Sequence, residues 1–176
     1  REAEVEYRNS QMLLRDAVER SASWPVPRLP GAFESAIDFL TAFEGMTKPR
    51  QGRLVEAEAD VRRALLSRLT AVGKYHIDTA QISGYLANLL SGQARFTEAE
   101  QLARAAVEIY RSLGYPENAP AHAFALNRLA TTLFSQRRWE EASEVYAQLD
   151  VATKDWDTSR AALIGADWPR IFTYYN

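Results

Sequence analysis

The sequence has no cysteine among its 176 residues and only two histidines. Without cysteine, the chain has no disulfides, cysteine zinc sites or cysteine nucleophile of its own. His76 and His122 fall at predicted loop-to-helix junctions, and no metal-ligand spacing, P-loop or G-x-G-x-x-G motif accompanies them. We therefore expect a protein that is not an enzyme and needs no metal or cofactor. A catalytic domain elsewhere in a longer chain stays open.

A strong excess of charge and a long apolar run are missing as well. The formal net charge is -2, whereas nucleic-acid-binding domains are usually clearly basic. No apolar run approaches the roughly 20 residues that a membrane-spanning helix needs. These absences argue against a nucleic-acid partner and against membrane insertion. The compartment stays open between the cytoplasm, which is slightly favoured, and the periplasm, because proteins of both can lack cysteine.

What the sequence does contain is a repeat. Three short segments resemble one another, the second starting 42 residues after the first and the third 43 residues after the second. A repeat of this period indicates stacked supersecondary units, and such an array is usually a surface that holds something else. Each segment places a bulky apolar residue three positions before an alanine: Leu54 and Ala57, Phe96 and Ala99, Trp139 and Ala142.

The apolar residues recur at three- and four-residue steps, which predicts helices, and no segment predicts a strand. Thr97 is expected to cap its helix, with Glu100 as the capping-box partner. Antiparallel helical hairpins joined by short turns and longer loops should result, about eight helices in all. The expected helices cover residues 1–20, 32–46, 54–72, 79–91, 97–113, 121–135 and 140–153, and one more starts near Asp167.

Residues 126–142 read L-N-R-L-A-T-T-L-F-S-Q-R-R-W-E-E-A. This segment resembles a tetratricopeptide repeat (TPR), most closely the 42-residue variety of kinesin light chains and many bacterial proteins. Those repeats typically run L-N-N-L-A-x-L-Y-x-x-Q-G-R-Y-x-E-A-E. Residues 83–100 match the same pattern, and residues 77–80 look like the H-P-D-T-A that opens such repeats. The turn glycine of the family is replaced by Ala94 and Arg137.

The resemblance implies an all-α fold, an α-solenoid of antiparallel hairpins that forms a right-handed superhelix. We expect one array over residues 1–176, with the best-matching repeats at 52–155. Residues 1–47 are a divergent repeat region with a proline-rich insertion at 21–31, and residues 156–176 start a further repeat. On this interpretation the chain is a slice of a longer array.

In this family the first helix of each hairpin lines the concave face, so the resemblance implies a partner-binding groove at the exposed positions of those helices. Asn127 matches the asparagine that often contacts a ligand backbone, and Arg128 adds a charged contact. The basic carboxylate clamp of the family is not reproduced, so an acidic C-terminus is not the first expectation. For each position, an ordinary solvated polar residue is an equally weighted alternative. The predicted groove residues are Gln81, Gly84, Asn88, Ser91, Phe124, Asn127, Arg128, Thr131 and Phe134.

The remaining motif residues are interpreted as architectural. The three alanines should lie where two helices approach closely, and the bulky residues that precede them should cover the hairpin end. Charged residues such as Glu98, Glu100 and Arg104 are interpreted as an ordinary solvated helix face.

The expected function is a scaffold that binds a peptide or a partner protein in the concave groove. The alternative is a regulatory or sensing module of a larger protein, for example one fused to a peptidase, kinase or transcription-factor domain. The partner and the oligomeric state stay open.

Overall fold

The computed structural model describes residues 48–156 without a gap, together with residues 5, 6, 9, 12, 13, 15, 16, 37, 38 and 40–42. Every element within these residues is helical, and they contain no strand, which confirms the all-α class. The elements are a 3-10 helix, η2 (Lys48–Gln51), and five α-helices: α3 (Leu54–Val72), α4 (Ile77–Gly92), α5 (Phe96–Ser112), α6 (Pro120–Ser135) and α7 (Trp139–Thr153).

The number of helices is lower than the predicted eight, since the described residues give bounds for five α-helices and one 3-10 helix. The described residues between 5 and 16 and between 37 and 42 are helical too, in agreement with the first two expected helices. The helix expected near Asp167 and the insertion at 21–31 lie outside the described residues, so these two predictions stay untested.

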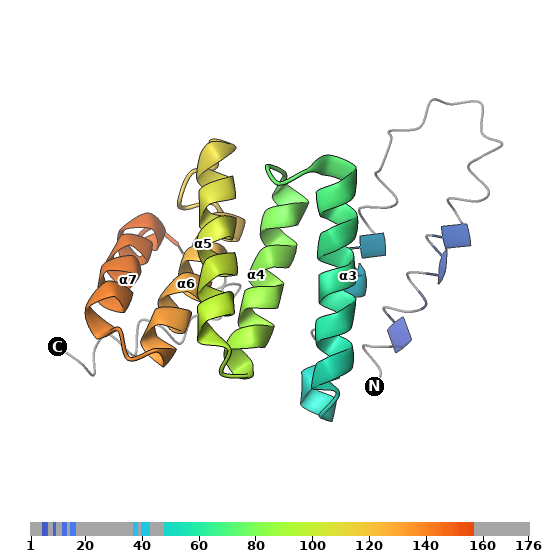
Figure 1. Ribbon diagram of the computed structural model, residues 1–176. Helices are drawn as coiled ribbons and strands as arrows, with labels where there is room; N and C mark the ends of the chain where they lie inside the picture. The colour runs from blue at the N-terminus through green and yellow to red at the C-terminus, as the bar shows by residue number, and fades with distance from the viewer. Residues whose placement is uncertain are drawn as a thin grey trace.

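The helices form two rows (Figure 1). α4 and α5 pack as one antiparallel hairpin and α6 and α7 as the next, while α3 packs on α4. α4 also packs directly on α6, whereas the backbone of α5 lies farther from those of α3 and α7. The row of α4 and α6 is therefore the tighter one. An array whose helices lie closer together on one side curves toward that side, so α4 and α6 form the inner row of an α-solenoid.

The core depends on small residues where the helices approach closely. Ala57, Ala99 and Ala142 are at most 1% exposed, as expected. The bulky residues at the helix starts behave differently from the expectation: Leu54 and Trp139 are 41% and 52% exposed, so neither covers its hairpin end completely.

The turns that precede α3, α5 and α7 share one backbone conformation. In each, an arginine N–H donates to the carbonyl five residues earlier, at 3.1, 3.0 and 3.1 Å for Arg53, Arg95 and Arg138. The residue before each arginine has a positive φ: Gly52 at 75°, Ala94 at 59° and Arg137 at 61°. Glycine adopts this left-handed conformation freely, while a residue with a Cβ does so at a cost of roughly 1–2 kcal/mol. The family glycine is lost from two turns, but the turn itself is kept.

Replacing Ala94 or Arg137 with glycine should therefore stabilise the fold. We expect each variant to raise the free energy of unfolding by about 0.5–1 kcal/mol, because the relieved strain exceeds the extra chain entropy of glycine. Urea denaturation monitored by circular dichroism measures this. Gly52→Ala is the matched control: a Cβ there would have no atom within 4 Å, so its destabilisation reports the backbone alone. A loss of stability in both glycine variants would contradict the turn assignment.

Candidate partner-binding face

The inner row presents one half-buried stripe on each helix. Residues at three- and four-residue steps lie on the same side of a helix. On α4 and α6, residues at such steps are partly exposed, while most of their neighbours are buried. We call these six residues the inner face: Gln81, Tyr85 and Asn88 on α4, and Phe124, Arg128 and Thr131 on α6.

The centre of the inner face is a contact between α4 and α6. An Nη atom of Arg128 donates a 2.6 Å hydrogen bond to Oδ1 of Asn88. The guanidinium lies 4.6 Å from the ring centroid of Phe124, a cation–π distance. Phe124 meets Tyr85 edge to face, with ring centroids 6.0 Å apart. The guanidinium thus contacts the Asn88 amide of α4 and the Phe124 ring of its own helix, and Tyr85 of α4 contacts the same ring.

Arg128 is incompletely satisfied by the protein. Its Nε is buried without a hydrogen-bond partner, and no carboxylate among the residues that the structure describes forms an ion pair with it. Burial lowers the pKa of Arg128, but a guanidinium stays protonated at neutral pH. A half-buried charge without an acidic partner favours an oxygen acceptor supplied from outside to the accessible part of the guanidinium.

The structure places the predicted groove residues unevenly. Gln81, Asn88, Phe124, Arg128 and Thr131 lie on the inner face, and Asn88, Phe124 and Arg128 contact one another. Ser91 is half-buried in the last turn of α4. Their role in binding stays a prediction.

Three predicted positions differ from expectation. Gly84 and Asn127 are buried, Asn127 with 3% of its surface exposed, so their expected exposure is wrong. Each precedes an inner-face residue, and one residue is a rotation of about 100° around a helix. Phe134 is half-buried at the α6–α7 turn, where its ring meets that of Trp139 edge to face at 4.7 Å.

Tyr85 is the inner-face residue that the sequence reasoning missed. It stands four positions after Gln81 and three before Asn88, so helical spacing alone could have found it. The motif match pointed to its neighbour Gly84 instead.

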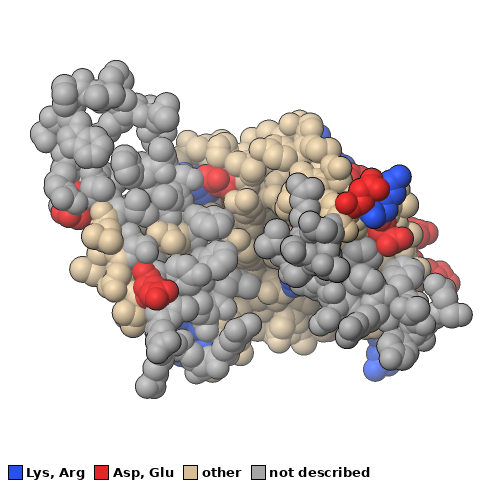
Figure 2. Space-filling view, turned by 180° about the vertical axis from the view of Figure 1, so that it is seen from behind, with Lys and Arg blue, Asp and Glu red and all other residues tan. Residues whose placement is uncertain are grey.

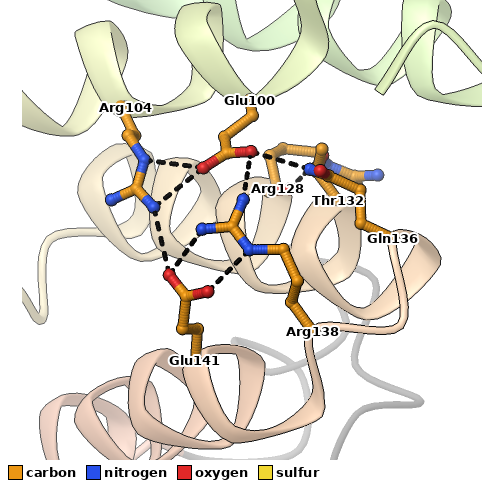
Figure 3. A network of polar contacts seen from close by, with 7 residues as sticks. All are labelled: Glu100, Arg104, Arg128, Thr132, Gln136, Arg138 and Glu141. Carbon is orange, nitrogen blue, oxygen red and sulfur yellow. Dashed lines mark hydrogen bonds and ion pairs between the residues drawn. The ribbon is translucent and has the colours of Figure 1, made fainter. Parts of the chain in front are cut away.

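Outside the inner face, acidic and basic residues link consecutive repeats. Figure 3 shows Glu100 of α5 between two arginines. It accepts hydrogen bonds from Arg104 at 2.8 Å, from Gln136 at 2.8 Å and from Arg138 at 2.6 Å. Arg138 also donates to Glu141 at 2.5 Å. The turn before α7 is therefore fastened to the helix of the preceding repeat.

The same arrangement occurs one repeat earlier. Glu58 of α3 accepts from Arg62 at 2.8 Å and from Arg95 at 2.7 Å, and Arg95 also donates to Glu98 at 2.7 Å. We call the two sets the ion ladder: Glu58, Arg62, Arg95 and Glu98, then Glu100, Arg104, Arg138 and Glu141. It joins consecutive repeats outside the inner face.

The structure corrects two expectations, one about the charged helix face and one about the start of α5. The side chains of Glu58 and Glu100 are only 18% and 15% exposed, so Glu100 is not part of an ordinary solvated face. Burial raises the pKa of Glu100, but hydrogen bonds from Gln136, Arg104 and Arg138 outweigh it and hold the pKa below its ordinary value. Thr97 is not a cap, because α5 starts at Phe96 and its N-cap residue is Arg95.

The view from behind shows how little charge the described part of that side carries (Figure 2). Where residues on that side are described, most of the visible surface is uncharged, with a few acidic and basic side chains among it. None of the described helices is both long and apolar enough to cross a membrane. The described residues also contain no group of three or more potential metal ligands.

Comparison with known proteins agrees with the two rows of helices. Models of the tetratricopeptide repeat match residues 44–112 and 125–149, which together make up more than half of the chain. The chain belongs to the tetratricopeptide repeat family. TPR arrays generally mediate protein–protein interactions and are generally non-catalytic scaffolds. No curated protein sequence matches this TPR chain.

Among solved structures, the TPR array is similar to the crystal structure of BtubC (BKLC) from P. vanneervenii. The TM-score is 0.68 at 18% sequence identity, and the match covers 96% of this chain and 68% of the other. At this identity the likeness shows the fold alone.

Proposed function

We propose that this TPR array is a scaffold that binds a peptide segment of a partner protein along the inner face. The observation that carries the proposal is Arg128, a half-buried cation that hydrogen-bonds to Asn88 and has no carboxylate partner among the described residues. An oxygen acceptor of a partner segment would pair with the accessible part of its guanidinium.

The surroundings of Arg128 support a protein ligand. Residues that dominate binding energy at protein interfaces are enriched in arginine, tyrosine and tryptophan, and they lie near the centre of the contact. Arg128 and Tyr85 are of these types, and the Phe124 ring contacts both side chains. Gln81, Asn88 and Thr131 surround them with hydrogen-bonding side chains, which suits an extended backbone.

The arrangement of the two rows supports an elongated ligand. The inner face takes three residues from each of two helices that pack directly on one another. A segment that crosses both helices would meet the Asn88–Arg128 pair at their junction. A large folded ligand is less suited to this side, because α4 and α6 form the tighter, concave row.

Arg128→Ala and Phe124→Ala should each weaken binding about tenfold, a loss of roughly 1.4 kcal/mol. The probe is a peptide selected on the wild-type protein from a random-sequence library and titrated by calorimetry. Arg128→Ala removes the charged donor, and Phe124→Ala removes the aromatic contact. Both variants should stay folded by circular dichroism, because neither residue is fully buried.

The matched control is Arg111→Ala on the outer row, where the arginine side chain is 52% exposed and pairs with Glu117. Its affinity for the peptide should equal that of the wild type. If Arg111→Ala abolishes binding and the two inner-face variants do not, the proposed binding face is wrong.

A further inference from the structure

The turns before α5 and α7 have the same backbone but carry different side chains. Each of the three hydrogen bonds that close the earlier turn has an equivalent in the later one, and Ala94 and Arg137 share a φ near 60°. Three positions nevertheless become bulkier from one turn to the next: Ser91, Ala94 and Phe96 correspond to Phe134, Arg137 and Trp139. Since the backbone is the same, the fold of the turn does not require the larger side chains.

Trp139 exposes an aromatic surface at this turn. Its side chain is 52% exposed and its ring meets Phe134 edge to face at 4.7 Å, whereas Phe96 at the same position of the earlier turn is half-buried. A half-exposed tryptophan loses much of the stabilisation that burial would give. Tryptophan is also the residue most enriched at the centres of protein interfaces.

Arg137 adds a charge to the same turn. It is exposed, and it forms no ion pair or side-chain hydrogen bond with any residue that the structure describes. The next residue, Arg138, is fully engaged by Glu100 and Glu141. Arg137 keeps its charge in a left-handed conformation that costs stability and that glycine would adopt freely. Such strain clusters at functional sites, and at Arg137 it comes with a charged side chain that Ala94 lacks.

We propose that Phe134, Arg137 and Trp139, the turn patch, form a second contact point for a partner protein and bind a carboxylate side chain that stands next to a large apolar side chain. The carboxylate would give Arg137 the acidic partner that Arg53, Arg95 and Arg138 each find within the chain. The apolar side chain would cover the exposed part of Trp139. The proposal rests on the proposed function only in that the array binds protein; it uses a different surface.

A subtractive peptide selection tests the turn patch. A random-sequence peptide library is selected on the wild-type protein, and peptides that the Trp139→Ala variant also retains are removed. The remaining peptides should share an Asp or Glu next to an aromatic or aliphatic residue. A selection that leaves no peptide, or peptides without a carboxylate, would overturn the proposal.

Titration of one selected peptide then separates binding from stability. Arg137→Gly should lower its affinity about tenfold while raising the unfolding midpoint, a combination that loss of folding cannot produce. Ala94→Gly, the matched control, should raise the midpoint and leave affinity unchanged. Replacing the peptide carboxylate with its amide should cost the same factor on the wild type and nothing more on Arg137→Gly. Wild-type affinity in Arg137→Gly would refute the proposal.

The two proposals fail separately. The library is also selected without subtraction, and its peptides are titrated on Arg128→Ala and Arg137→Gly. Loss in Arg128→Ala alone would support the inner face and reject the turn patch. Loss in Arg137→Gly alone would support the turn patch and reject the inner face.

Discussion

Replacing Arg68 with alanine is expected to lower the free energy of unfolding by about 3–5 kcal/mol. Arg68 is 1% exposed on α3, and its Nε donates to Oδ2 of Asp38 at 2.6 Å. Ser67 donates to the same oxygen, and Asp78 lies 4.0 Å from the Arg68 guanidinium. Removing the cation would leave Asp38, which is only 15% exposed, as a poorly compensated charge. Chemical denaturation of the two proteins measures the difference.

Two further variants show whether the poorly compensated charge of Asp38 causes the loss of stability. Arg63→Ala removes an arginine of the same helix that is 70% exposed and pairs with Asp60, so its effect should stay within about 0.5 kcal/mol. The double variant Arg68→Met with Asp38→Leu should recover much of the stability, since buried ion pairs can be replaced by apolar residues at little cost. A double variant as unstable as Arg68→Ala would show that shape, not charge, is decisive.

Glu100→Ala should give the second-largest loss, about 2 kcal/mol. The variant removes the acceptor that fastens Arg138 and Gln136 of one repeat and Arg104 of the other (Figure 3). Part of the loss is offset because Arg138 keeps Glu141 and its surroundings are partly solvated. Ser143→Ala is the matched control: it lies 43 residues later at the equivalent position, is exposed, and should change little. Equal stability of the two variants would contradict a role of the ion ladder.

The same carboxylate predicts a dependence on pH. The pKa of Glu100 in the folded protein lies below the ordinary 4.5. Its contribution is therefore fully present above about pH 4.5 and disappears as the pH falls through the lowered folded pKa. The difference in unfolding free energy between wild type and Glu100→Gln should shrink below pH 4.5. A difference that grows on acidification would contradict the assigned contacts.

The helices were predictable because their signals are local. Periodicity together with turn and capping residues gave α3 at its observed bounds, and α4 to α7 within two residues at each end. The repeat pattern predicted the buried alanines Ala57, Ala99 and Ala142 of the core. The position of the N-cap was missed at α5 because the left-handed conformation of Ala94 is not evident where glycine is absent.

The ion ladder could not be found in the same way. Its bonds between repeats join residues 36 to 38 positions apart, such as Glu58 with Arg95 and Glu100 with Arg138. Each residue alone fits a solvated helix face, and only the stacking of one repeat on the next brings the charges together and covers them.

Motif matching selected the two helices of the inner row and five of the six inner-face residues. It missed Tyr85, and two of the residues it selected, Gly84 and Asn127, are buried. Their role in binding stays a prediction. A helix turns by about 100° per residue, so a sequence motif alone cannot tell which of two neighbouring residues is exposed. The hydrogen bond between Asn88 and Arg128 joins two repeats and was likewise beyond the sequence.

The most direct test of the inner face is a map of peptide binding at single-residue resolution. The 19.9 kDa chain is small enough for amide nitrogen–proton correlation spectra, recorded during titration with a peptide from the selection on wild type. We predict that the largest shifts fall on residues 81–88 of α4 and 124–131 of α6. Large shifts confined to the outer helices α3 and α5, with α4 and α6 unchanged, would contradict the proposal that this TPR array binds its partner on the inner face.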